Sequence, residues 1–433
     1  MRRRRERIVV VGAGLAGLRA AERLRELGFS GELVIVGAET HPPYHRPALS
    51  KHFLTGDLDA RDLTLPSYVP LNARWRLGTT VARLDPSRRV LHLFGGEQLR
   101  YDGLVIATGV GERHISGVPR RDPRVHTLRT LDDALALQRT LTATDGKVVV
   151  VGGGFTGCEL ASTLRELGRD VAIVSRSDVL LGRVFGAEMG EALGKLHEAR
   201  GVSLSVGVEV QNWMTGDQDV GLHLSDGTML VADCVVLAVG NRPAIDWLRG
   251  SGLHLPDGVL CGPTCHVVGA QDIVAAGDVA CWPNLRFDRT PRRVEHWLNA
   301  VEMGRAAAAN LIAGPSSAQP FTPLPRFWSE QHGVRLQAAG MPTLGHDTVP
   351  LSGNPVRDRG VLGYTNFGNL VGLVGRENPR EVLRWTAELE RHTQGHVDAT
   401  TIRAVGAARR RQWTSWQRSR RRGDRPRPAL RAG

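Results

Sequence analysis

The sequence contains no long hydrophobic run and only a few cysteines. No stretch of about eighteen apolar residues occurs among its 433 positions, so we expect no membrane-spanning helix. The cysteine count, five, is odd, which argues for reduced thiols in a cytoplasmic protein rather than for a disulfide framework. Cys261 and Cys265 are four positions apart, but no second ligand pair accompanies them. We therefore predict no metal site.

The body of the chain has almost no excess of either charge, although the formal net charge of the whole sequence is +12. Residues 403–433 contain eleven arginines and one acid, and residues 1–7 contain five arginines and one acid, which leaves −2 for the remainder. The folded body therefore lacks the charge expected of a nucleic-acid-binding surface. We expect residues 396–433 to form a basic disordered tail, with contact to anionic lipid, RNA or an acidic partner as the alternative.

Two segments share one pattern, in which an apolar strand runs into a glycine turn and then an amphipathic helix. A second apolar strand follows each helix. The two copies begin 140 residues apart, at Ile8–Val11 with Gly12-Ala13-Gly14-Leu15-Ala16-Gly17, and at Val148–Val151 with Gly152-Gly153-Gly154-Phe155-Thr156-Gly157. This pattern predicts two βαβ units that each bind a dinucleotide.

The glycines of the first copy have distinct roles in such a unit. Gly12 permits the tight turn, Gly14 lets the backbone approach a pyrophosphate, and Gly17 lets the helix pack against the strand. The phosphates then lie at the unpaired N–H groups of the helix N-terminus.

The second copy differs where its second strand ends. A carboxylate at that position would bind the ribose diol of NADH, whereas this chain has Ser175 and Arg176. Because a guanidinium can bind a 2′-phosphate through two hydrogen bonds, we expect a slight preference for NADPH over NADH. An ordinary surface arginine with no preference is the alternative.

Beyond the two glycine turns, the chain contains Thr108-Gly109, Gly277-Asp278 and four longer characteristic segments, Pro42–Lys51, Leu128–Ala134, Val294–Trp297 and Phe327–Gln331. With these segments the chain resembles pyridine-nucleotide-dependent flavoprotein reductases of the glutathione-reductase structural type. Among them, it is similar to the putidaredoxin-reductase-like ferredoxin reductases that serve bacterial cytochromes P450 and Rieske oxygenases. The resemblance covers residues 7–394.

This resemblance implies an α/β fold with two Rossmann-like dinucleotide-binding domains and a C-terminal α+β domain. The implied FAD-binding domain is discontinuous, residues 7–114 and 246–320. Residues 115–245 would form the NAD(P)H-binding domain and residues 321–395 the C-terminal domain. The oligomeric state stays open between monomer and homodimer.

The resemblance also implies roles for individual residues. Lys51, Glu159 and Trp328 are the expected catalytic residues: Lys51 near the flavin N5, Glu159 near the nicotinamide, and Trp328 beside the flavin or toward a docking surface. Glu39 is the candidate for the FAD ribose, because Ala38 stands where many relatives have an acid. The residues expected to bind FAD, together with Lys51 and Glu39, are Gly12, Gly14, Leu15, Ala16, Gly17, Arg46, Val81, Ala107, Thr108, Gly109, Arg129, Gly277, Asp278, Glu295 and Trp297. Those expected to bind NAD(P)H, together with Glu159, are Gly152, Gly154, Phe155, Thr156, Gly157, Ser175, Arg176 and Gly240.

Residues 29–157 contain no cysteine, although disulfide reductases of this structural type carry a redox pair after the first βαβ unit. Without that thiol, disulfide or peroxide reduction through a cysteine lacks its nucleophile. We therefore expect hydride transfer from NADH or NADPH to FAD, followed by single-electron transfer to a [2Fe–2S] ferredoxin that supplies a P450 or Rieske oxygenase. The alternatives are a rubredoxin-type reductase or NAD(P)H oxidase, and a redox-sensing flavoprotein like apoptosis-inducing factor.

Overall fold

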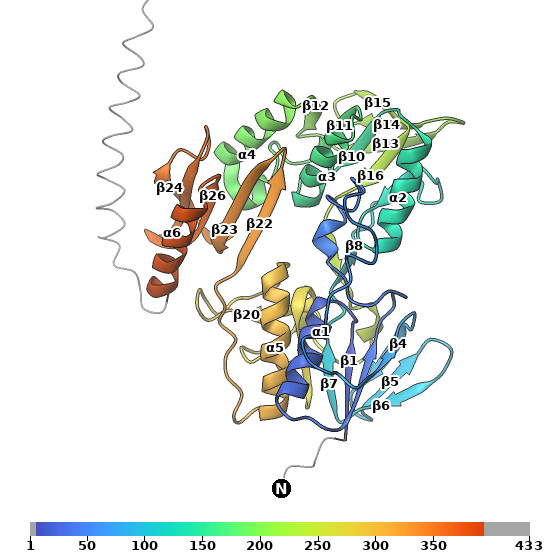
Figure 1. Cartoon of the computed structure of the whole chain (residues 1–433), viewed down its shortest axis with the longest axis vertical. Helices are drawn as coiled ribbons and strands as arrows, with labels where there is room; N and C mark the ends of the chain where they lie inside the picture. Colours follow the sequence, from blue (N-terminus) through green and yellow to red (C-terminus); the bar gives the residue numbers. More distant parts are fainter. Residues whose placement is uncertain (1–5, 394–433) are drawn as a thin grey trace, which may run out of the picture. The chain divides into compact units, whose positions relative to one another are not determined.

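The computed structural model describes residues 6–393 (Figure 1), and these separate into two compact units that divide between residues 335 and 336. The basic tail predicted for residues 396–433 lies outside the described residues. The division into an FAD-binding, an NAD(P)H-binding and a C-terminal domain, with the boundaries given above, stays a prediction. Among residues 6–393, no helix combines the length and the apolar character that crossing a membrane requires.

The first unit contains two five-stranded parallel sheets. The first sheet has the order β19-β7-β1-β2-β3. Four of its strands are nearly continuous apolar runs, as expected when helices and loops cover both faces, whereas β3 at the edge has the sequence ARWR. The five strands are β1 (Arg7–Val11), β2 (Glu32–Val36), β3 (Ala73–Arg76), β7 (Gly103–Ile106) and β19 (Ile273–Ala275).

The first unit has two halves, each built around one of the parallel sheets. In the half with the first sheet, two helices pack side by side, α1 (Leu15–Glu26) and α5 (Trp297–Ala313) (Figure 1). Their close approach depends on small residues, because a Cβ on Gly304 of α5 would overlap the Ala16 carbonyl of α1. Leu18, Ala21 and Leu24 of α1 are buried, as its 3.6-residue pattern predicts.

The second parallel sheet has the order β12-β11-β10-β16-β9 and repeats the first in four strands, with β12-β11-β10-β16 matching β3-β2-β1-β7. Its fifth strand, β9, precedes β10 in the chain, whereas β19 follows β7. Its strands are β10 (Val148–Val151), β11 (Val171–Ser175), β12 (Val202–Val206), β16 (Cys234–Leu237) and β9 (Val125–Thr127). The helices of this half are α2 (Leu131–Ala143), α3 (Phe155–Glu166) and α4 (Gly182–Ala199), which is interrupted at Gly186. The two predicted βαβ units are therefore present.

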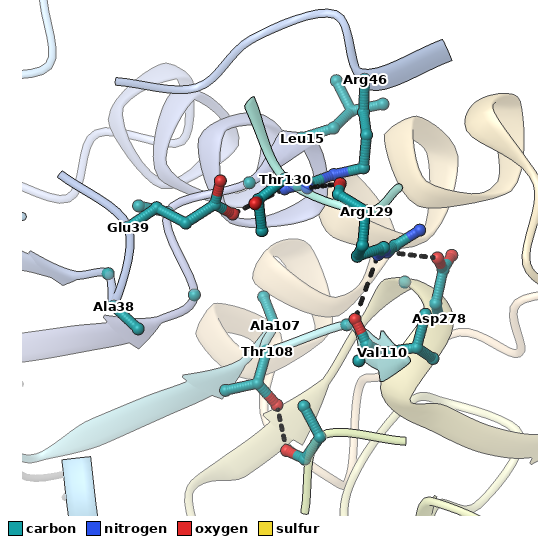
Figure 2. Close-up of a pocket in the computed structure, with 18 of the residues that line it drawn as sticks. Leu15, Ala38, Glu39, Arg46, Ala107, Thr108, Val110, Arg129, Thr130 and Asp278 are labelled. Carbon is teal, nitrogen blue, oxygen red and sulfur yellow. Dashed lines mark hydrogen bonds and ion pairs between the residues drawn. The ribbon is translucent and has the colours of Figure 1, made fainter. Parts of the chain in front are cut away.

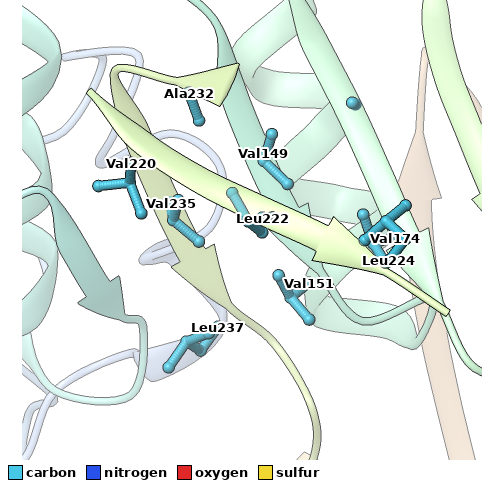
Figure 3. Close-up of a cluster of buried hydrophobic side chains, with 10 residues drawn as sticks. Val149, Val151, Val174, Val220, Leu222, Leu224, Ala232, Val235 and Leu237 are labelled. Carbon is cyan, nitrogen blue, oxygen red and sulfur yellow. The ribbon is translucent and has the colours of Figure 1, made fainter. Parts of the chain in front are cut away.

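A three-stranded antiparallel sheet accompanies each parallel sheet. In the second half, alternate residues of β14, such as Leu222, pack on β10 and β16, so that the small sheet closes one face of the parallel sheet (Figure 3). The strands are β4 (Val81–Asp85), β5 (Val90–Leu93) and β6 (Gln98–Arg100) in the first half, and β13 (Val210–Thr215), β14 (Val220–Leu224) and β15 (Met229–Ala232) in the second.

Short elements complete the first unit. β8 (Val110–Glu112) pairs with β17 (Asn241–Pro243), where the chain passes between the two halves. β18 (Val259–Leu260), β20 (Ala280–Pro283) and β21 (Pro291–Arg292) form a small sheet, and η1 (Arg46–Ala48), η2 (Asp246–Leu248) and η3 (Gly277–Val279) are single 3₁₀ turns. Residues 314–325 contain no helix or strand and lead into β22 (Arg326–Gln331).

The second unit is an antiparallel sheet with one helix. β23 (Val334–Gly340), β26 (Asn369–Arg376), β25 (Gly360–Asn366) and β24 (Asp347–Gly353) are hydrogen-bonded in that order, and η4 (Pro342–Leu344) follows β23. α6 (Pro379–His392) buries Val382, Trp385 and Leu389 and contacts β26 and β25. The predicted α/β class with a C-terminal α+β part is confirmed.

Candidate functional site

A cavity of about 850 Å³ opens beyond the carboxyl ends of the first parallel sheet, where ligands bind in open α/β sheets. Segments that are distant in the sequence contribute to its lining, among them those that contain Glu39, Arg129 and Asp278 (Figure 2). Seventeen of the predicted site residues line it: Gly12, Gly14, Leu15, Ala16, Glu39, Arg46, Val81, Ala107, Thr108, Gly109, Arg129, Thr156, Glu159, Gly277, Asp278, Glu295 and Trp297. These seventeen residues, which are distant in the sequence, therefore lie around one cavity.

The first glycine turn has the geometry of a phosphate cradle. Gly12 has φ +114°, its N–H donates to the Val36 carbonyl at 2.8 Å, and a Cβ there would overlap the Ala107 carbonyl. A Cβ on Gly17 would overlap the Gly12 carbonyl. On Gly14, by contrast, a Cβ would meet no protein atom within 4 Å, and this residue faces the cavity. Gly12 and Gly17 therefore serve the fold, whereas the open side of Gly14 is available to a ligand.

Helix α1 begins immediately after Gly14 with no side-chain cap and no acidic residue in its first turn. Its first N–H groups consequently lack the intrahelical partners that later residues have. Together with the positive end of the helix dipole, these groups suit an anionic pyrophosphate.

The second glycine turn repeats this arrangement. Gly152 has φ +130°, and its N–H donates to the Val174 carbonyl at 2.7 Å. A Cβ on Gly157 would overlap the Gly152 carbonyl, and one on Gly154 would again meet nothing within 4 Å. Helix α3 likewise begins without a side-chain cap or an acid in its first turn. The chain therefore contains two equivalent cradles, and Thr156 and Glu159 of α3 reach the cavity that the first cradle borders.

Glu39 holds two neighbours at the cavity wall. Its Oε1 accepts from Arg46 Nη2 at 2.7 Å and its Oε2 accepts from the Tyr44 hydroxyl at 2.5 Å. Arg46 Nη1 also donates to the Arg129 carbonyl, and the Leu131 N–H donates to Tyr44 Oη at 3.0 Å. Burial raises the pKa of Tyr44, which therefore stays a hydroxyl donor at neutral pH. Tyr44 was not predicted as a site residue, and its position in the Pro42–Lys51 segment was the available signal.

Arg129 and Asp278 form a second charged pair in the cavity lining (Figure 2). Arg129 Nη2 lies 3.6 Å from Asp278 Oδ2, and Arg129 Nε donates to the Val110 carbonyl at 3.2 Å. Burial raises the pKa of Asp278 to about 6, and the Arg129 charge acts in the opposite direction. The pair offers both a cation and an oxygen acceptor to a ligand with phosphate and hydroxyl groups.

Lys51 and Glu159 meet at the cavity edge. Lys51 Nζ lies 2.9 Å from Glu159 Oε1, and Glu159 is 9% exposed. Ser329 Oγ donates to the same oxygen at 2.7 Å, and Ser50 Oγ donates to Oε2 at 3.1 Å. Lys51 reaches the site through this ion pair rather than through the cavity lining. The two serines were not predicted, although each lies in a segment that carried the resemblance.

Aromatic rings surround the start of α5 and the start of α3. His45 packs edge-on against Trp297 with ring centroids 4.7 Å apart, and Phe155 packs edge-on against Phe327 at 5.3 Å. Trp328, predicted to be catalytic, is 38% exposed and does not line the cavity. Its role remains a prediction.

The end of β11 contains the predicted nucleotide-selective pair. Ser175 is buried, and its hydroxyl bonds with the backbone of Ser177. Arg176 is exposed. Gly240 follows β16 in the chain and has φ +92°. None of these three residues lines the cavity.

The five cysteines are free and buried, and none of them lines the cavity. Burial raises the pKa of Cys158, and it raises that of Cys234 to about 12, so that these thiols are not nucleophiles at neutral pH. Across residues 6–393, no group of three His, Cys, Asp or Glu residues is arranged to hold a metal ion.

Comparison with known proteins agrees with this geometry. The family model described as pyridine nucleotide-disulphide oxidoreductase matches residues 6–304. The ferredoxin--NAD(+) reductase component of a 3-phenylpropionate/cinnamic acid dioxygenase from Photorhabdus laumondii is 30% identical over 88% of this chain and 95% of its own length. Rhodocoxin reductase from Rhodococcus erythropolis is 34% identical over 86% and 87%.

Solved structures with the same fold include reductases. The covalent putidaredoxin reductase–putidaredoxin complex has a TM-score of 0.83 at 28% identity and covers 93% of this chain and 99% of its own. The ferredoxin reductase for the CYP199A2 system of Rhodopseudomonas palustris has a TM-score of 0.79 at 30% identity, covering 86% and 91%.

Proposed function

We propose that this chain, which belongs to the pyridine nucleotide-disulphide oxidoreductase family, oxidises NAD(P)H at a bound FAD and reduces a ferredoxin. One observation carries the proposal. The cavity is bordered by residues from both nucleotide-binding halves, and no cysteine is present in its lining. No cysteine sulfur is therefore available in the cavity to accept electrons that a nicotinamide delivers there.

The residues of the cavity fit FAD. The Gly12–Gly17 turn would hold the pyrophosphate, because Gly14 leaves the backbone accessible and α1 presents uncapped N–H groups. Arg46, held in place by Glu39, and Arg129, held by Val110, would supply positive charge to the phosphate and ribose side. Asp278 would accept a hydrogen bond from a ligand hydroxyl.

When bound, FAD supplies the chemistry that accepts a hydride and releases two electrons one at a time. The protein's part is to place charges and exclude water. Lys51 provides an ammonium donor whose position Glu159 fixes at 2.9 Å, and Glu159 is itself fixed by Ser50 and Ser329. The resemblance implies that Trp328 lies beside the flavin or toward a docking surface, and its exposure favours the docking surface.

The second glycine turn would hold the pyrophosphate of the nicotinamide dinucleotide. Ser175 and Arg176 occupy the position where a carboxylate would select NADH, so we infer a preference for NADPH. The exposure of Arg176 leaves its guanidinium able to reach a 2′-phosphate.

The partner is inferred from the relatives, whose names include ferredoxin reductase components of dioxygenase systems. We propose a [2Fe–2S] ferredoxin that in turn supplies a P450 or a Rieske oxygenase. A cytoplasmic location and a monomeric or homodimeric state belong to the same proposal.

The test is ferredoxin-dependent reduction of cytochrome c. With NADPH and the FAD-loaded protein, the rate should rise in proportion to added [2Fe–2S] ferredoxin and should remain low without it. Rapid oxygen consumption without ferredoxin would identify an oxidase instead. A higher rate with rubredoxin would identify a rubredoxin-type reductase. Slow turnover with every acceptor, together with a long-lived complex with NADP⁺, would indicate a redox-sensing flavoprotein.

A further inference from the structure

A buried polar chain leads from Glu159 through side chains that do not line the cavity. Ser329 and Gln331 lie on β22, His197 lies near the end of α4, and His332 lies in the turn after β22. His197 and Gln331 are fully buried, and Ser329 is 1% exposed. Buried polar groups of this kind are retained where they are hydrogen-bonded, and each of these has a hydrogen-bond partner.

The direction of every hydrogen bond follows from the carboxylate. Because Glu159 Oε1 accepts, Ser329 Oγ must donate at 2.7 Å. Ser329 Oγ in turn accepts from Gln331 Nε2 at 3.2 Å. Gln331 Oε1 therefore faces His197, whose Nε2 must carry the proton that it donates at 3.1 Å.

The two imidazoles complete the chain. A neutral His197 that donates from Nε2 accepts at Nδ1, and His332 Nε2 donates to that atom at 3.0 Å. Burial lowers the pKa of His197. Burial also lowers the pKa of His332 to about 4, with His197 and the charges of Arg200 and Arg165 acting in the same direction. Both rings are therefore neutral at pH 7, which is the state that the chain requires.

Helix α3 fixes both ends of this arrangement. Glu159 and Ser162 are three positions apart and thus lie on one face of the helix. The His332 backbone N–H donates to Ser162 Oγ at 2.6 Å, although His332 has φ +51°, in the left-handed region. His332 and Gly333, with φ +74°, form a two-residue turn of the kind that such conformations favour. The turn thus sets the position of the outer imidazole relative to α3.

We propose that His197 is a positioning residue that acts through Gln331 and Ser329 to fix the Glu159 carboxylate against Lys51. Four hydrogen bonds point in one direction, from His332 toward the carboxylate, so each strengthens the next and all of them stabilise the negative charge. Without His197, Gln331 loses the donor that holds its amide, and Ser329 becomes free to turn away from Glu159. This inference rests on the proposed function only in taking the Lys51–Glu159 pair to face the reacting part of the cofactors.

The test uses the FAD-loaded full chain with His197→Leu, His197→Gln, Ser329→Ala and the double variant His197→Leu/Ser329→Ala. Two quantities are measured: the single-turnover rate of flavin reduction by NADPH, and the midpoint potential of the bound FAD. For His197→Leu we expect the rate to fall about tenfold, which is the effect of weakening one hydrogen bond to a charged group. The potential should shift negative, because the Glu159 charge is less well compensated. His197→Gln retains one donor and one acceptor and should recover most of both quantities.

The double variant separates positioning from simple packing. If His197 acts through Ser329, adding His197→Leu to Ser329→Ala changes neither quantity further. His126→Gln is the matched control, because His126 is also buried and hydrogen-bonded, to Thr140, but has no link to Glu159. If His197→Leu fails to fold, Gln331→Leu breaks the same chain from β22 and is expected to give the same two shifts.

A wild-type potential in His197→Leu, or losses that add fully in the double variant, would overturn the inference. That failure is distinguishable from failure of the proposed function. The latter would appear in the wild-type protein, as an inability to bind FAD or to reduce ferredoxin.

Discussion

The equivalent glycine turns allow ligand binding to be separated from folding by single substitutions. Gly14→Ala adds a Cβ that meets no protein atom within 4 Å, at a residue whose φ of −87° suits alanine. As the N-cap of α1, an alanine costs roughly 1 kcal/mol of stability or less relative to glycine. We therefore expect Gly14→Ala to fold with a nearly unchanged melting temperature.

The same Cβ should weaken FAD binding considerably, because it stands on the side of the turn that faces the cavity. It would hold the pyrophosphate away from the N–H groups at the start of α1 and so weaken at least one charge-assisted hydrogen bond. Such a bond contributes about 1.5–3 kcal/mol, which corresponds to a rise in the Kd for FAD of about tenfold to a hundredfold. The Kd is measured by titrating FAD into apoprotein and following the loss of flavin fluorescence, and folding is followed by circular dichroism.

Two variants bracket this result. Gly154→Ala, in the second turn, should retain FAD and raise the Kd for NADP⁺ by a similar factor, because its Cβ is equally unobstructed by protein. Gly17→Ala should instead destabilise the fold, since its Cβ would overlap the Gly12 carbonyl. The reasoning is refuted if Gly14→Ala binds FAD as tightly as the wild type, or if Gly154→Ala loses FAD while keeping its affinity for NADP⁺.

Three other perturbations follow from the site. Arg176→Ala should lower kcat/KM for NADPH about tenfold, because one guanidinium–phosphate contact is lost, and should leave kcat/KM for NADH unchanged. Substitution of the exposed Arg88 by alanine is the control and should alter neither value. Equal losses with both nucleotides would contradict this prediction. Cys158→Ala should preserve ferredoxin reduction, because that thiol is fully buried and lies outside the cavity; loss of the activity with retained FAD would indicate a thiol in the electron path. Burial lowers the pKa of His296 and of His332 to about 4, from an ordinary value of 6.5, so the unfolded chain binds protons between these values and the folded chain does not. Stability should thus fall as the pH drops from about 6.5 to about 4, by on the order of 2 kcal/mol for the pair after allowance for partial exposure, as measured by urea midpoints; a flat profile would contradict the burial of these rings.

Local pattern was sufficient to predict the elements that place the cofactors. The β-branched runs, the glycine spacing and the amphipathic helices are properties of short segments, and the strands β1 and β10 and the helices α1 and α3 appear where these patterns predict them. Most of the lining residues that were predicted belong to the glycine turns or to the recognised segments. Val81 belongs to neither and was predicted only from the resemblance, because no property of the isolated position would have identified it.

The supporting hydrogen bonds could not be predicted because they join residues far apart in the chain. Ser329 reaches Glu159 across 170 positions, and His197 reaches Gln331 across 134. Periodicity identifies which face of a helix is buried, but it does not identify which polar side chain on another element will complete a buried bond. For the same reason, Trp328 could be predicted as functional from its segment, but its exposure outside the cavity lining could not.

The absorbance spectrum of the purified protein during anaerobic titration with NADPH tests the central claim most directly. The account predicts a yellow protein, or one that becomes yellow when FAD is added, whose flavin absorbance is bleached by about one equivalent of NADPH and restored by oxidised ferredoxin. A protein that remains colourless with FAD, or whose reduced flavin is reoxidised by disulfides but not by any ferredoxin, would contradict it.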